Sequence, residues 1–146
     1  MIIKNPEIAE NAMKSAKIKA VAQHMELNDH DAKGITHLPD NYFTFANEEY
    51  LVLTEYEANE KVKEYIKETV WAFDPTFLAD HSCIDQVVIE KLQESCESAN
   101  EALLKLIKNF DDFVEDAVRI DGRGHFLAGY DGNENEQGDF YLYRTN

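Results

Sequence analysis

The chain has 146 residues, of which 44% are hydrophobic, so it is long and apolar enough to bury a core and does not have the composition of a disordered chain. Its 29 acidic and 14 basic residues give a formal net charge of -15 at pH 7. This charge excludes direct binding to nucleic acid or to an anionic membrane, because both need clustered lysine and arginine.

A negative charge of this size favours a protein partner with a basic surface, or one whose surface is built to bind nucleic acid. Solubility alone is the simpler explanation of the same charge. The sequence begins without the basic and apolar regions of a signal peptide, and no apolar run is long enough to cross a membrane. Cys83 and Cys96 match neither a disulfide framework nor a metal site. We therefore expect a cytoplasmic protein that uses no cofactor.

The N-terminal part of the chain is expected to form one helix and one β-hairpin. Residues 5–7, Asn-Pro-Glu, are typical of a helix start, and an alanine-rich apolar stripe extends this N-terminal helix over residues 1–28. Residues 29–41 contain glycine and proline breakers and form a connector. Two aromatic and β-branched runs, 42–45 and 50–53, flank a short polar turn and predict the hairpin.

Helices are expected to follow, so that residues 42–120 form the hairpin and a set of helices. Thr54 and Glu57 have the spacing of a capping box at the first of these helices. The polar run at 94–100 is either a break between two helices or the solvent face of one long helix. Residues 121–122, Asp-Gly, suit the end of the last helix.

The last 26 residues, 121–146, contain five of the six glycines and no helical pattern. They are expected to form a C-terminal hairpin with strands at 126–130 and 140–144 around the loop 131–139. The whole chain, 1–146, is therefore expected to be a single α+β domain, with about four to five helices packed on a small antiparallel sheet made of two hairpins.

Asp121, Arg123 and His125 occupy alternate positions at the start of this segment. In an extended strand they would face one side, where the carboxylate could orient the imidazole and the guanidinium could hold an anion. Because this arrangement would suit acid–base chemistry, the three residues are the candidate catalytic residues. The alternative is structural: Gly122 and Gly124 allow a tight turn, and Arg123 pairs with nearby carboxylates.

The loop between the predicted C-terminal strands has oxygen-bearing side chains on alternate residues, as in a calcium-binding loop. The sixth position of such a loop requires glycine but is Glu136, and the twelfth requires a bidentate glutamate but is Leu142. We therefore expect an acidic, solvated loop rather than a metal site. The residues concerned are Asp131, Asn133, Asn135 and Asp139.

Two groups of carboxylates with helical spacing are the candidate partner-binding residues. Carboxylates about one turn apart can imitate a row of phosphates and engage a basic groove. The alternative is an ordinary solvated helix face. The first and denser group consists of Asp111, Asp112, Glu115 and Asp116. The second group, which is interleaved with lysines, consists of Glu57, Glu60 and Glu64.

The C-terminal segment DGRGHFLAGYDGNENE…FYLYRTN resembles the ending of a largely uncharacterised family of small bacteriophage and mobile-element proteins. The segments EYLVLTEYEA, at 49–58, and WAF, at 71–73, are also similar to that family. The resemblance covers 49–146 and carries no catalytic residues with it. It implies a phage-encoded accessory protein made in a bacterial cytoplasm.

Small acidic phage proteins without catalytic motifs often act by binding. The leading hypothesis is therefore an accessory protein that binds a host protein through an acidic surface, as an anti-restriction or anti-CRISPR-like anti-defence inhibitor would. The first alternative is a small enzyme, a hydrolase or nucleotide-handling protein, with a site around Arg123 and His125. The second is a structural or oligomeric module, such as a homodimer formed through the tyrosine-rich C-terminal hairpin.

Overall fold

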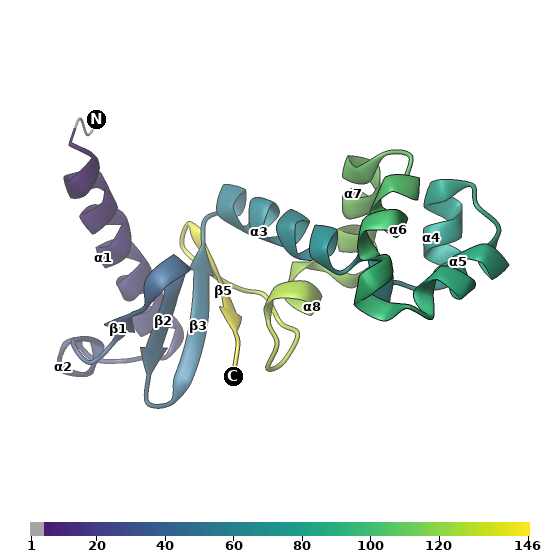
Figure 1. The fold of residues 1–146 in the computed structure, drawn as a ribbon. Coiled ribbons are helices and arrows are strands. Elements are labelled where there is room, and N and C mark those ends of the chain that lie inside the picture. The colour runs from purple at the N-terminus through teal and green to yellow at the C-terminus, as the bar shows by residue number, and fades with distance from the viewer. Residues whose placement is uncertain (1–4) are drawn as a thin grey trace. The chain divides into compact units, whose positions relative to one another are not determined.

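The computed structural model describes residues 5–146, and the chain falls into two compact units. Unit 1 consists of Met1–Asn59 and Arg123–Asn146, and unit 2 of Glu60–Gly122. The fold is α+β, as predicted, with eight α-helices and a five-stranded antiparallel sheet among the described residues (Figure 1). No helix within residues 5–146 combines the length and the apolar character that a membrane crossing needs. That residues 1–146 form a single domain stays a prediction.

Unit 1 is built on the sheet, whose strands run in the order β1-β2-β3-β5-β4. Each neighbouring pair of strands is antiparallel. Because β3 pairs with β5, the hairpins β2-β3 and β4-β5 lie side by side in one sheet, and β1 adds a short edge strand. The strands are β1 (Thr36–His37), β2 (Tyr42–Phe45), β3 (Glu48–Leu53), β4 (Asn135–Gln137) and β5 (Phe140–Arg144).

The predicted hairpin at 42–53 is confirmed. β2 covers the predicted run, and β3 begins two residues earlier than expected, at Glu48. Ala46 and Asn47, between the strands, have φ values of 50° and 70°. A two-residue turn of type I′ needs this left-handed pair, because its twist matches that of the flanking strands. The resulting register places Phe43 opposite Tyr50.

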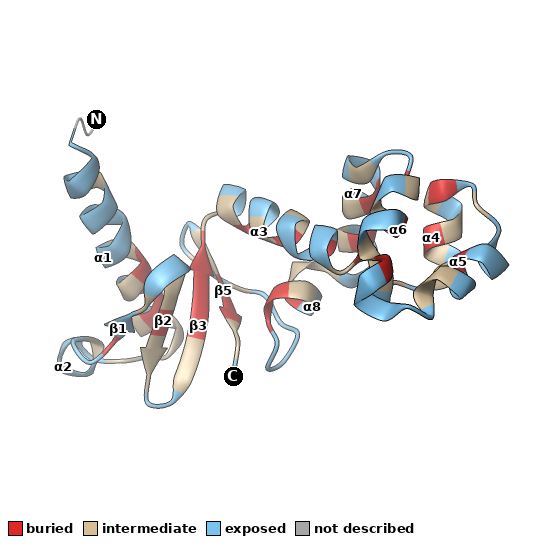
Figure 2. Ribbon diagram, viewed as in Figure 1, coloured by how far each residue is buried: buried red, intermediate tan, exposed pale blue. Residues whose placement is uncertain are grey.

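One face of the sheet is covered by α1, Pro6–His24. The predicted helix start is confirmed, since the Asn5 side chain accepts a hydrogen bond from the Glu7 N–H at 3.0 Å. The second half of the helix packs on the sheet, whereas the first half is mostly exposed (Figure 2). The core cluster between helix and sheet consists of Ala20, Val21, Ile35, Phe43, Tyr50, Val52 and Leu142.

The N-terminal helix ends earlier than predicted, and the connector is partly regular. α1 stops at His24, and Glu26 takes a left-handed φ of 56°, so the helix does not reach residue 28. The predicted connector contains α2, Asp29–Ala32, as well as β1 and the 3-10 helix η1, Pro39–Asn41.

The prediction of a strand at 126–130, the first strand of the C-terminal hairpin, is wrong. The chain forms the short helix α8, Arg123–Leu127, and β5 pairs instead with β4, which lies inside the predicted loop. Gly122, with φ of 82°, ends the preceding helix as predicted and lets a new helix begin. Leu127, the last residue of α8, and Ala128, which follows it, are buried. β4 forms although its side chains are polar, because strand pairing is made by the backbone.

Unit 2 is helical. The described residues contain more helices than the predicted four to five, partly because α2 and α8 of unit 1 form where a connector and a strand were expected. Asp74, Asp85 and Asn109 each accept a hydrogen bond from a free N–H of the helix that follows, at 2.8, 2.9 and 3.1 Å. Each of these caps starts a new helix. The polar run at 94–100 is a break rather than a helix face, since it contains the 3-10 helix η3, Cys96–Ala99.

The elements of unit 2 are the second half of α3 (Glu55–Glu68), which starts in unit 1, together with η2 (Val70–Ala72), α4 (Pro75–Ser82), α5 (Gln86–Gln93), η3, α6 (Asn100–Leu106) and α7 (Phe110–Asp121). Its largest buried side chains are Ile66, Leu78, Ile89, Leu103 and Phe113. α7 ends at Asp121, so the predicted stop at Asp-Gly is confirmed.

Candidate functional site

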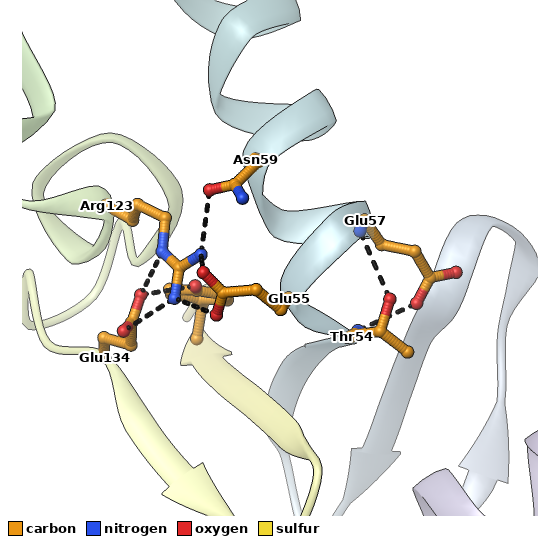
Figure 3. Close-up of polar contacts among 7 residues, drawn as sticks. Thr54, Glu55, Glu57, Asn59, Arg123 and Glu134 are labelled. Carbon is orange, nitrogen blue, oxygen red and sulfur yellow. Dashed lines mark hydrogen bonds and ion pairs between the residues drawn. The ribbon is translucent and has the colours of Figure 1, made fainter. Parts of the chain in front are cut away.

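The most connected polar group of unit 1 is centred on Arg123, at the start of α8 (Figure 3). The Nε and Nη2 atoms of Arg123 donate to the two carboxylate oxygens of Glu134 at 2.8 and 3.0 Å. Nη1 lies 3.1 Å from a carboxylate oxygen of Glu55 and donates to Asn59 Oδ1 at 3.0 Å. Only 9% of the Arg123 side chain is exposed. All three nitrogens of the guanidinium are therefore engaged by protein oxygens.

Two tyrosines of β5 complete this group. The Tyr143 hydroxyl donates to Glu134 Oε2 at 2.5 Å, and Tyr143 is fully buried. The guanidinium of Arg123 lies over the ring of Tyr141, 4.6 Å from its centre, which is a cation–π contact. We refer to Glu55, Asn59, Arg123, Glu134, Tyr141 and Tyr143 as the Arg123 cluster.

The contacts shift the pKa values of four groups of the cluster. The hydrogen bonds that Arg123 donates to Glu134 raise the pKa of Arg123, and the hydrogen bond that it donates to Glu55 lowers the pKa of Glu55. Burial, followed by the hydrogen bond to Glu134, raises the pKa of Tyr143. The hydrogen bond to Glu55 raises the pKa of Tyr141. These shifts favour the cationic form of Arg123, the anionic form of Glu55 and the neutral phenols of Tyr141 and Tyr143.

Gly124 is the residue that allows this cluster to assemble. A Cβ atom at this position would lie 2.5 Å from Gly132 O, 2.7 Å from Asn133 C and 2.8 Å from Glu134 N. These contacts are with backbone atoms, which cannot swing aside as a long side chain can. The missing side chain therefore lets the segment 132–134 lie directly on α8, which brings the Glu134 carboxylate to Arg123.

The Arg123 cluster links segments of the fold to one another and does not form a site for a bound anion. A bound phosphate or carboxylate would have to displace Glu55 or Glu134 from Arg123, and both flanking charges would repel it. The alternative that the sequence left open, in which Arg123 pairs with nearby carboxylates, is confirmed.

The structure does not place the three candidate catalytic residues on one extended strand. Asp121 ends α7 and belongs to unit 2, whereas Arg123 and His125 belong to unit 1. The backbone is helical rather than extended, so Arg123 and His125, two residues apart, point to different sides of α8. His125 is exposed, and its ring contacts Phe126 at 4.9 Å between centres. The prediction that these three side chains share one face of an extended strand is therefore wrong.

The four oxygen-bearing residues of the calcium-like loop have separate structural settings. The Asp131 carboxylate accepts the N–H of Asn133 at 3.0 Å. Asn135 pairs with Leu142 in the sheet, and Asp139 lies in the turn between β4 and β5. Among residues 5–146, no group of three or more histidine, cysteine or acidic side chains is arranged to hold a metal ion.

The acidic group on α7 is only partly free. Asp111 forms an ion pair with Lys63 at 2.7 Å, and Asp116 lies 3.0 Å from His81 Nε2. Asp112 and Glu115 are exposed and take part in no ion pair within the described part of the chain. Helical spacing places both of them away from the buried side of α7, which is formed by Phe113 and Ala117.

The second acidic group is divided. Glu57 forms the predicted capping box, since it accepts the Thr54 N–H at 2.9 Å and donates its own N–H to Thr54 Oγ1 at 3.2 Å (Figure 3). The same carboxylate lies 2.7 Å from Lys17 Nζ, whose side chain is 2% exposed. Glu57 is therefore half-buried in unit 1 and paired with a buried lysine, while Glu60 and Glu64 are exposed on α3 in unit 2.

Sequence reasoning missed the partners that give Arg123 and Lys17 their roles. Lys17 also donates to Asn41 Oδ1 at 2.8 Å, so it links α1 to η1 and to the start of α3. Its position on the buried side of α1, near Ala20 and Val21, was the available signal, because a lysine on an apolar helix face needs a partner.

Comparison of the chain with protein-family models, with curated proteins and with solved structures gives no match.

Proposed function

We propose that this protein is an accessory protein of the bacteriophage or mobile-element type, which acts in a bacterial cytoplasm by binding a host protein through an acidic surface. The finer proposal is an anti-defence role, in which the acidic surface occupies a basic, nucleic-acid-binding surface of a restriction or CRISPR component. The proposal rests on the large number of carboxylates that form no ion pair within residues 5–146.

Ion pairs among residues 5–146 engage only a minority of the 29 acidic side chains. Within residues 5–146, the acidic residues in ion pairs are Glu48, Glu55, Glu57, Glu94, Glu101, Asp111, Asp116 and Glu134. Some of the remaining acidic side chains, such as Asp74, Asp85 and Asp131, accept backbone N–H groups, and the others keep their charge available to a partner. Such a surface accelerates association with a basic protein and makes the affinity depend on salt.

Asp112 and Glu115 are the residues on which the proposal is tested first. They are exposed, lie about one turn apart on α7 and are not paired with a cation among the described residues. Three residues of helix correspond to a rise of about 4.5 Å, which is of the same order as the phosphate spacing of about 3.4 Å along one strand of B-DNA. A helix that repeats carboxylates at this spacing suits a groove that normally binds phosphates.

Affinity capture from a bacterial lysate tests the proposal. The charge-reversed pair Asp112→Lys with Glu115→Lys is compared with Glu90→Lys with Glu97→Lys, which makes the same change of charge at exposed positions elsewhere in unit 2. The proposal expects a host protein that is retained at low salt, is lost with the α7 pair and is kept with the control pair. Retention that is equal for both variants, or no retained protein, would contradict it.

A plating assay tests the anti-defence role separately. Phage sensitive to restriction or to a CRISPR system is plated on cells that express the protein, with and without that system. The proposal expects plating to rise only where the defence system is present. Unchanged plating with a confirmed binding partner would reject the anti-defence role and keep the binding role.

A further inference from the structure

We draw no further inference here: the strongest candidate, the apolar face on the first half of α1 formed by Ile8, Ala9, Ala12, Met13 and Ala16, is an unpartnered helix face, and nothing in the structure shows what covers it.

Discussion

Arg123 and Glu134 form a two-point ion pair, in which parallel N–H groups donate to both carboxylate oxygens at 2.8 and 3.0 Å. The Tyr143 hydroxyl donates to the same carboxylate, so one side chain joins α8 to β5. Paired hydrogen bonds between charged groups are the strongest kind that a protein side chain makes. The pair therefore holds the segment that carries Glu134 against α8, and we expect it to be a major source of stability.

Removing Arg123 should destabilise the protein strongly. Arg123→Ala leaves two carboxylates close together without their cation, and we expect a loss of about 3 kcal/mol in the free energy of unfolding. Arg123→Lys keeps the charge but loses the two-point geometry, so its loss should be intermediate. Urea denaturation measures both values.

Arg119→Ala is the matched control for Arg123. Arg119 is 69% exposed and pairs with Asp116 on its own helix at 3.3 Å. A surface pair of this kind contributes at most about 1 kcal/mol. A loss for Arg123→Ala no larger than the loss for this control would show that the Arg123 cluster does not stabilise the fold.

Gly124→Ala should destabilise the protein even though alanine favours helices. The gain in helix propensity is about 1 kcal/mol. It is outweighed by the contacts of the new Cβ with backbone atoms at 2.5–2.8 Å, since relief of these contacts moves Glu134 away from Arg123. We expect a net loss of about 2 kcal/mol, measured by thermal or urea unfolding.

Gly129→Ala is the control for Gly124. Its added Cβ would meet its nearest atom, Thr145 O, only at 3.7 Å, which is ordinary contact. We expect the stability of this variant to stay within about 1 kcal/mol of the wild-type value. If Gly124→Ala behaves like Gly129→Ala, the close packing of 132–134 on α8 is refuted.

Tyr143→Phe tests the hydroxyl that reaches Glu134. The substitution removes one hydrogen bond to a carboxylate and leaves an acceptor without that partner, so the expected loss is about 1–3 kcal/mol. Tyr130→Phe serves for comparison, because Tyr130 is exposed and uses its ring to stack on Arg144. Denaturant unfolding should separate the two variants, and equal stabilities would argue against the role of Tyr143.

Glu57 should make stability depend on pH in the acidic range. Burial alone would raise the pKa of Glu57, but the hydrogen bonds from Lys17 and Thr54 outweigh it and lower the pKa below its ordinary value of 4.5. A group with a lowered pKa in the folded state stabilises that state fully above its unfolded pKa, and this contribution is lost as the pH falls through the folded pKa.

The stability difference between wild type and Glu57→Gln should therefore be constant above about pH 4.5 and shrink at lower pH. Unfolding in urea across this range measures the difference, and Glu60→Gln, an exposed position on the same helix, should show no comparable change. A difference that stays the same down to pH 2 would mean that Glu57 is not held in its charged form by Lys17.

Local patterns predicted the elements that local interactions determine. The capping box of Thr54 with Glu57, the turn between the runs 42–45 and 50–53, and the helix stop at Asp121 each depend on residues within a few positions of one another. The structure confirms all three. Their signals are turn residues, caps and periodicity, which one sequence displays directly.

The errors concern elements that depend on distant contacts. Phe126 and Leu127 suit a strand, but they belong to α8, on which the segment 132–134 packs at Gly124. β4 has no strand-like composition and forms because β5 supplies a partner. The sequence contains 29 acidic side chains with which Arg123 could pair. The fold determines that one of its partners is Glu55, which is 68 positions away.

The proposal that the acidic face of α7 binds a host protein is tested most directly by the dissociation constant of the captured partner. We predict that Asp112→Lys with Glu115→Lys weakens binding by at least about tenfold, and that higher salt weakens wild-type binding, because both changes reduce attraction to a basic surface. Glu90→Lys with Glu97→Lys should change the constant far less. Equal constants for the wild type and the α7 variant would contradict the proposal.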